Sequence, residues 1–215
     1  MTIDTFIENL AKTAVSPKVT NQYTHKTQYV TQNKIRRDNL QAYLHRMTAI
    51  QPQFMLVGEA PGYRGARLTG IPFASPDMLT QLPSRLGIST LTIPNEWSHI
   101  QKEASATIMW ETLAQVTASP ELAEATVPLL WNAFPFHPHK PNNQQSNRRP
   151  TSKELALGRP FLQELNNLFT IQTIIAVGNT AAQALTRWDI PHEKVRHPSY
   201  GGKADFQTGL FKLLA

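Results

Sequence analysis

The sequence predicts an α/β fold, a three-layer α/β/α sandwich around a central, mainly parallel sheet. Apolar runs of strand length alternate with longer segments of helical periodicity, the pattern of parallel strands joined by covering helices. Three runs lead into loops at Gly58, Asn132 and Gly178, and His197 is expected to leave a further strand. Because ligands of such folds bind beyond the carboxyl ends of the strands, these four residues predict one shared site.

A single domain is predicted over residues 1–215, with 1–50 as a helical N-terminal extension and 51–215 as the α/β core. A short helix is expected over 5–12, followed by a polar stretch over 16–34. A second helix is expected around 39–44, where Leu40, Tyr43 and Leu44 share one face.

Within the core, strands are predicted over 54–57, 127–134 and 173–178. Helices are predicted over 104–116, over 151–169 and from residue 180. Thr151 with Glu154 three residues later is the pattern of a capping box, which marks the start of the long helix.

Composition restricts the classes of chemistry. The chain of 215 residues carries 21 Lys and Arg against 15 Asp and Glu, a net charge of +6, which suits a polyanionic partner such as nucleic acid. It has no cysteine, which excludes disulfides, thiolate nucleophiles and Cys-ligated metal or iron–sulfur sites. No apolar run has the length of a membrane span, and the N-terminus lacks a signal-peptide pattern. We therefore expect a cytoplasmic, intracellular protein without membrane contact.

Five motifs occur in a recognisable order along residues 51–210. They are Gly58-Glu59-Ala60-Pro61-Gly62 with Thr69-Gly70-Ile71-Pro72-Phe73, then Trp131-Asn132, Asn147-Arg148-Arg149-Pro150-Thr151, Ile175 to Ala182, and His197-Pro198-Ser199. Together they resemble the uracil-DNA glycosylase superfamily, closest to families 4 and 5. Those families hold a four-cysteine iron–sulfur cluster, whereas this chain has His137-Pro138-His139 where a cysteine would stand. A relative without the cluster, and without any cofactor, is therefore expected.

The resemblance implies roles for three side chains around a base flipped out of DNA. Asn132 would read the base, since its amide can donate to uracil O4 and accept from N3–H. Phe73 would stack on the base. His197 would donate to O2 as negative charge develops there.

The first motif would line the pocket through Gly58, Ala60, Pro61 and Gly62, whose backbone N–H groups can approach a base or phosphate closely. Ala60 stands where the best-studied branch places a water-activating Asp. Glu59 is therefore expected to polarise the water or to orient the base or a phosphate.

Two further points around the first motif stay open. Asp77 is an alternative carboxylate for activating the water, although a turn or helix-cap role is the simpler interpretation. Gly62 stands where a strict uracil enzyme has a tyrosine that blocks the methyl group of thymine. Tyr63 follows it, so tolerance for bases substituted at C5 is undecided.

Contacts with the DNA backbone are expected from a basic loop formed by His137, His139, Lys140, Arg148 and Arg149. The same loop could instead replace the missing cluster as a shaped element, or be simply solvated. A metal site is rejected because no third or fourth ligand has suitable spacing. Ser199 could enter the duplex to fill the space that a flipped base leaves.

The function predicted from these residues is a monofunctional DNA glycosylase that hydrolyses the bond between uracil and deoxyribose in base excision repair and leaves an abasic site. Monofunctional action is inferred because the motifs contain no lysine that could form a Schiff base. Uracil-containing DNA is the expected partner of a monomeric enzyme. Two alternatives remain: a glycosylase for another deaminated or mismatched base, and a non-catalytic DNA-binding protein that keeps the fold.

Overall fold

A four-stranded parallel sheet forms the centre of the structure, a computed structural model that describes residues 1–26, 28–88, 91–95, 102–118 and 127–214. The strands lie in the order β3-β2-β5-β6. Their bounds are β2 Phe54–Gly58, β3 Leu129–Asn132, β5 Thr173–Val177 and β6 Glu193–Val195. From β2 the chain moves to β3 on one side and later to β5 on the other, so β2 lies at the switch point of the topology.

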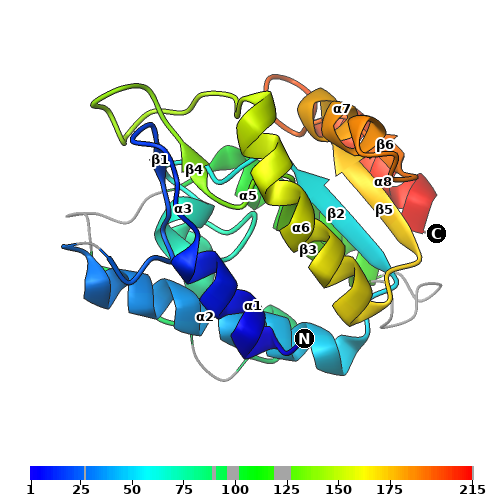
Figure 1. The fold of residues 1–215 in the computed structure, drawn as a ribbon. Helices are drawn as coiled ribbons and strands as arrows, with labels where there is room; N and C mark the ends of the chain where they lie inside the picture. The colour runs from blue at the N-terminus through cyan, green and yellow to red at the C-terminus, as the bar shows by residue number, and fades with distance from the viewer. Residues whose placement is uncertain (27, 89–90, 96–101, 119–126, 215) are drawn as a thin grey trace.

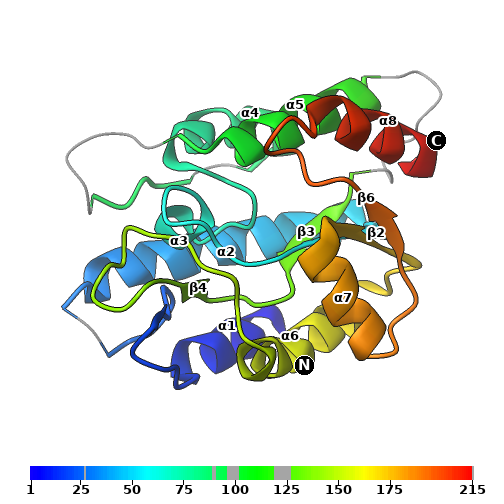
Figure 2. The ribbon, with the colours of Figure 1, turned by 90° about the horizontal axis from the view of Figure 1, so that it is seen from above.

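Helices cover both faces of the sheet, which confirms the three-layer sandwich (Figures 1 and 2). One layer contains α1 (Ile3–Lys12), α6 (Ser152–Phe169) and α7 (Asn179–Arg187). The opposite layer contains α4 (Leu82–Leu86), α5 (Ala104–Thr117) and α8 (Lys203–Leu214). The central strands are buried on both faces, as parallel strands between helices require.

The predicted strand over 127–134 is shorter in the structure, where β3 covers four residues. Beyond Asn132, the N–H groups of Ala133 and Phe134 still donate to the carbonyls of Gly58 and Glu59, at 2.8 and 3.1 Å. The chain therefore leaves the sheet gradually beside the first motif. Helix α6 begins with the predicted capping box, in which Thr151 and Glu154 bond reciprocally.

Helix α2 (Val30–Ile50) runs along the β3 edge of the sheet and is longer than predicted (Figure 2). It closes that edge, because the hydroxyl of Tyr43 accepts a hydrogen bond from the N–H of Leu130 at 2.7 Å. The expectation of a polar, non-helical stretch up to residue 34 is wrong. Asn33 and Arg36 face the interior and donate to tertiary carbonyl groups, so the buried face is polar and shows no hydrophobic periodicity.

The N-terminal segment shares the hydrophobic core with the sheet. Phe6 of α1 packs on Trp131 of β3 and Phe161 of α6, with ring centroids 5.4 and 5.9 Å apart. The short strand β1 (Val19–Thr20) pairs antiparallel with β4 (His137–Pro138), close to the end of the main sheet. The first fifty residues therefore support the region where the motifs meet.

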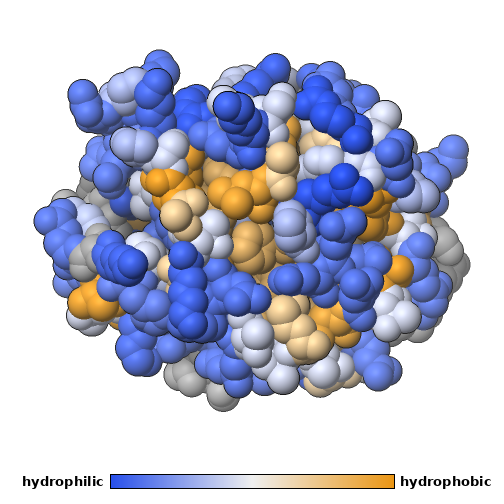
Figure 3. Space-filling model, in the orientation of Figure 1, coloured by the Kyte–Doolittle hydropathy of each residue, from blue (hydrophilic) through white to orange (hydrophobic). Residues whose placement is uncertain are grey.

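The outer face of α1 and α6 is mostly hydrophilic, with apolar side chains showing near its middle (Figure 3). Leu157 of α6 is one of the few large apolar side chains that the described residues expose. None of the helices that the structure describes combines the length and the apolar composition needed to cross a bilayer.

Candidate active site

A cavity of about 260 Å³ lies at the carboxyl ends of the strands. Its volume is close to the lower limit of the volumes usual for ligand pockets. Its lining includes the predicted site residues Glu59, Ala60, Pro61, Gly62, Phe73, Asn132, His197 and Ser199. The expected convergence of residues from four distant segments is confirmed. The roles assigned to the individual side chains remain predictions.

Gly58 brings Phe73 and Asn132 together into a corner of this cavity. It ends β2 and lies opposite Asn132 in the sheet register. A Cβ atom at position 58 would lie 2.5 Å from Phe73 Cζ and 2.7 Å from Asn132 Oδ1, so only glycine permits this approach. Phe73 and Asn132 are nearly buried, at 8% and 5% exposure. An aromatic ring and a primary amide meeting in this way suit a flat, polar-edged ligand such as a base.

The loop that carries Phe73 is held by hydrogen bonds from both sides. Phe73 adopts a left-handed conformation with φ of 54°, and Trp110 Nε1 of α5 donates to its carbonyl at 3.0 Å. The hydroxyl of Thr69, at the end of the short helix α3 (Ala66–Thr69), donates to the carbonyl of Ala74 at 2.8 Å. Gly70 packs against Arg36, where a Cβ would lie 2.3 Å from the carbonyl oxygen. Each of Thr69, Gly70 and Phe73 in the motif thus has a defined local role.

His197 follows β6 and is set up as a hydrogen-bond donor through Nε2. The backbone N–H of Ser199 donates to Nδ1 at 3.2 Å, which assigns the proton of the neutral ring to Nε2. Burial, with the nearby charge of Arg196, lowers the pKa of His197. The ring packs on Gly178, where a Cβ would lie 3.0 Å from His197 Cβ.

The first motif is tied to β4 and to the loop after it. His137 Nδ1 lies 2.8 Å from the carbonyl oxygen of Pro61, and Nε2 lies 3.0 Å from that of Gln144. The side-chain oxygen of Asn147 accepts from the N–H of Tyr63 at 3.0 Å. Burial lowers the pKa of His137 to about 4, so at neutral pH the uncharged ring donates to one carbonyl at a time.

The expectation of a basic loop is therefore wrong for its histidines. His137 is fully buried, and His139 is nearly so, with Nδ1 2.9 Å from the carbonyl of Lys140. Because both rings are buried, neither is accessible to a DNA backbone. Residues here do not fit an iron–sulfur cluster, because thiolate ligands are lacking throughout the sequence. Where the resemblance places a cluster cysteine, an imidazole connects the loops instead.

Burial of neutral His137 predicts acid sensitivity of the fold. The unfolded ring has a pKa near 6.5 and the folded ring one near 4, so protons bind preferentially to the unfolded chain between these values. Stability should therefore fall as the pH drops from about 6.5 to 4, by up to about 3 kcal/mol from this residue. Urea unfolding across this range measures the fall, which should be correspondingly smaller in His137→Gln.

The matched control is His45→Gln, which changes an exposed histidine of α2 and should leave the pH profile as in the wild type. If His137→Gln lost as much stability as the wild type over the same pH range, the buried ring would not be the acid-sensitive group.

Arg148 is bound within the protein, which changes its expected role in contacting DNA. Its guanidinium donates to both carboxylate oxygens of Glu154, at 2.6 and 2.7 Å, and to the carbonyls of Lys18 and His139. Its charge is thus paired in place, and it fastens the loop to α6. Arg149 is exposed, and its side chain makes no hydrogen bond or ion pair with the described part of the chain.

A second cavity of about 810 Å³ adjoins the first and shares Glu59, His197 and Ser199 with it. It also contains the basic side chains of Arg149, Lys194 and Arg196 and the start of α7. The shared residues form the mouth of the first cavity. Phe73, Asn132 and Gly62 line only the first cavity, and we call this part of its lining, away from the second cavity, its inner end.

Asp77, the alternative carboxylate, does not line either of these cavities. It lies in the first turn of the 3₁₀ helix Pro76–Thr80 and accepts a hydrogen bond from Ser75. The turn interpretation is therefore the one that the geometry supports.

The lining also contains residues that the sequence interpretation missed, among them Tyr200 and Glu103. Tyr200 follows the His197 motif and is 99% exposed at the mouth, whereas Ser199 is partly buried. Its place directly after the motif was the available signal. Glu103 precedes α5 and lines the inner end, although nothing in its local sequence marks it.

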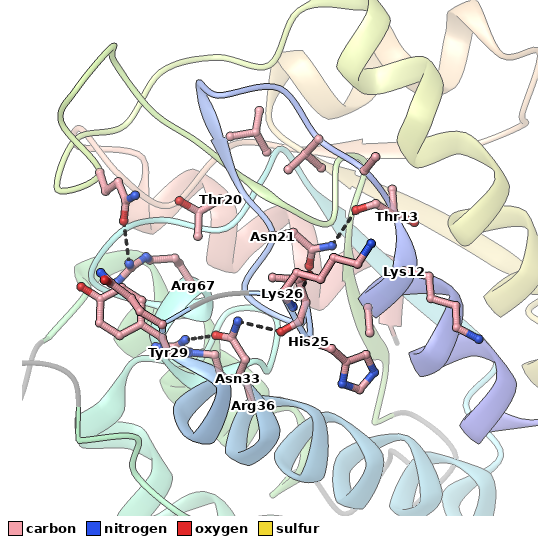
Figure 4. Close-up of a pocket in the computed structure, with 17 residues that line it drawn as sticks. Lys12, Thr13, Thr20, Asn21, His25, Lys26, Tyr29, Asn33, Arg36 and Arg67 are labelled. Atoms are coloured by element: carbon pink, nitrogen blue, oxygen red, sulfur yellow. Dashed lines mark hydrogen bonds between the residues drawn. The ribbon is translucent and has the colours of Figure 1, made fainter.

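A separate cavity of about 600 Å³ lies between the N-terminal segment and α2 and contains none of the predicted site residues (Figure 4). Asn21 donates to the carbonyl of Thr13 at 3.0 Å, and Asn33 donates to that of Thr24 at 3.0 Å. These bonds satisfy backbone groups where the N-terminal segment joins the core. We interpret this cavity as part of a structural junction.

Comparison with known proteins identifies the family of this chain. The family model of the Uracil DNA glycosylase superfamily matches residues 45–212, which include every predicted site residue. The chain belongs to this superfamily. The coarser part of the functional prediction, a DNA glycosylase of this superfamily, is thereby confirmed. No curated protein sequence matches the chain significantly.

Among solved structures, the wild-type SMUG2 of Pedobacter heparinus resembles the chain with a TM-score of 0.64. The two share 18% sequence identity, and the match covers 99% of this chain and 94% of the other. At this identity the likeness shows the fold. It covers the N-terminal helices in addition to the residues that the superfamily model matches.

Among the described residues, no cluster of three or more His, Asp or Glu side chains could hold a metal ion.

Proposed function

We propose that this member of the superfamily excises uracil from DNA by hydrolysis and leaves an abasic site for base excision repair. The corner formed by Phe73 and Asn132 over Gly58 carries the proposal. Its ring offers a stacking surface, and its amide offers one donor and one acceptor side by side. Uracil presents the complementary pair, an acceptor at O4 and a donor at N3.

In this mechanism the bond between C1′ and N1 breaks, and its electron pair moves onto the base. His197 donates from Nε2 to O2 of the departing uracil anion, and its lowered pKa keeps the ring neutral. Glu59 lines both cavities at the mouth of the first, where the sugar would lie. Its carboxylate orients a water molecule and accepts a proton as the water adds to C1′.

The DNA backbone would run over the second cavity, where Arg149, Lys194 and Arg196 gather beside the start of α7. Tyr200 and Ser199 would occupy the space in the duplex that the flipped nucleotide leaves. Tyr200 is the better placed of the two, because its side chain is free to insert and that of Ser199 is partly covered.

An oligonucleotide assay tests this function. A labelled duplex with a single uracil is incubated with the protein and treated with alkali, which cleaves the strand at an abasic site. Cleavage at the uracil supports the proposal. Cleavage only of duplexes with hypoxanthine or a mismatched pyrimidine would assign another base, and tight uracil-dependent binding without cleavage would indicate a non-catalytic protein.

The salt dependence of DNA binding should separate the two neighbouring arginines. Arg149→Ala should reduce the slope of log Kd against log salt by about one unit, because one phosphate contact is lost. Arg148→Ala should leave the slope nearly unchanged and instead lower the free energy of unfolding by about 2 kcal/mol, since it leaves Glu154 unpaired. Fluorescence anisotropy at several salt concentrations and urea unfolding measure these effects.

Lys212→Ala is the matched control, because it removes the same charge from α8 outside both site cavities. An unchanged slope for Arg149→Ala would show that this loop does not contact the DNA backbone.

A further inference from the structure

Glu103 directs its carboxyl group into the inner end of the base pocket. It is the residue before α5, yet its side chain does not cap that helix. Within the described part of the chain, its carboxyl group makes no hydrogen bond or ion pair, and only its backbone carbonyl accepts hydrogen bonds, from Thr107. A carboxyl group placed in this way is not explained by the stability of the helix.

The first motif makes room for this carboxyl group with two glycines. A Cβ at Gly62 would lie 1.9 Å from Glu103 Oε1, and a Cβ at Gly65 would lie 1.9 Å from Oε2. The carboxyl group therefore fills the space that side chains at both positions would take. The spacing of the glycines, three residues apart, matches the two oxygen atoms of one carboxyl group.

The lining of the two cavities shows which part of a substrate Glu103 would meet. Glu59, His197 and Ser199 border both cavities and surround the mouth, where the sugar and phosphates belong. Glu103 lines only the first cavity, as do Phe73 and Asn132. A base held by Phe73 and Asn132 would therefore lie in the same cavity as Glu103.

The chemistry of the pyrimidine ring then indicates which edge of the base Glu103 would face. Asn132 would bind N3 and O4, and His197 would bind O2, which leaves only C5 and C6 without an assigned partner. C5 lies next to O4, and in this arrangement it would point toward the part of the lining that Gly62 and Glu103 form. Burial raises the pKa of Glu103 to about 7. Near neutral pH its carboxyl group is therefore protonated in a large fraction of the molecules, and this uncharged acid would lie beside an uncharged base.

We propose that Glu103 is the specificity residue of this pocket and that its carboxyl group occupies the space beside C5, excluding the methyl group of thymine. This inference rests on the proposed function, since it needs a pyrimidine held by Asn132. The methyl group of thymine is excluded because the carboxyl group occupies the volume that it would need. A methyl group pressed against the carboxyl group would also deprive that carboxyl group of contact with water. Glu103 contacts the base and takes no part in breaking the glycosidic bond.

The test compares two substrates that differ by one methyl group, duplexes with a G·U or a G·T pair in the same sequence. Single-turnover rates are measured for the wild type, Glu103→Ala and Glu103→Gln. Removing the carboxyl group in Glu103→Ala should raise the ratio of thymine to uracil excision by about 10- to 200-fold, the usual effect of one methyl-sized contact. Glu103→Gln keeps the volume and should keep the wild-type ratio within about threefold.

The control is Glu111→Ala, which removes an exposed carboxylate of the same helix and should leave the ratio unchanged. An unchanged ratio in Glu103→Ala, a Glu103→Gln variant as permissive as Glu103→Ala, or efficient thymine excision by the wild type would each overturn the proposal.

A binding measurement separates this proposal from the proposed function. Duplexes carrying 2′-fluoro-deoxyuridine or 2′-fluoro-thymidine resist cleavage, so their Kd values report recognition of the base alone. Glu103→Ala should improve binding of the thymine duplex relative to the uracil duplex. If this shift occurs without any uracil excision, the pocket assignment holds and the enzymatic function fails; if excision occurs without the shift, Glu103 is not the specificity residue.

Discussion

Asn132→Asp is expected to reduce uracil excision by about 10⁴-fold, the largest single effect predicted for this site. In the proposed role the amide would donate to O4 and accept from N3–H, whereas a carboxylate has no proton to donate and would repel O4. Because Asn132 is nearly buried at the end of β3, water cannot replace the lost donor. Single-turnover excision from a uracil duplex measures the loss.

The same substitution should allow slight activity on cytosine, whose exocyclic amino group is a donor where uracil has O4. A matched duplex with cytosine at the target position tests this gain. Asn167→Asp is the control, because it makes the same chemical change at an exposed position of α6. Uracil excision by Asn132→Asp at nearly the wild-type rate would remove Asn132 from the role of base reader.

His197→Ala is expected to lower the single-turnover rate by about 10²–10³-fold with little change in the Kd for DNA. In the proposed mechanism the neutral Nε2–H group would face no full negative charge in the bound substrate, and its hydrogen bond would strengthen only as the uracil anion forms. Loss of such a donor raises the barrier by roughly 2.7–4 kcal/mol. Rates measured at saturating protein, together with binding to an uncleavable duplex, separate the two quantities.

His192→Ala is the control for His197→Ala, since it removes a partly exposed histidine just before β6 that lines neither site cavity. It should leave the rate within about twofold of the wild type, as surface substitutions away from a site usually do. A weaker Kd with an unchanged rate in His197→Ala would assign His197 to DNA binding.

Local sequence was sufficient to predict the main elements of the core. The apolar runs that became β2, β3 and β5 are short, continuous and bounded by loop residues, so their burial is visible without tertiary information. Thr151 and Glu154 marked the start of α6 for the same local reason. The early part of α2 was missed because Asn33 and Arg36 point inward, and their burial depends on carbonyl groups elsewhere in the fold.

The sequence by itself also determined that the motif residues meet at one site, because parallel strands place their carboxyl ends at one edge and the motifs follow those ends. What each polar group does there was decided only by the tertiary structure. Glu154 takes up the charge of Arg148, and burial keeps His137 neutral between two carbonyl groups. Glu103 reaches Gly62 from the residue just before α5, about forty residues further along the chain. The physical reason is common to all three: a strand position follows from local pattern, but the charge and accessibility of a side chain depend on neighbours that folding brings from distant segments.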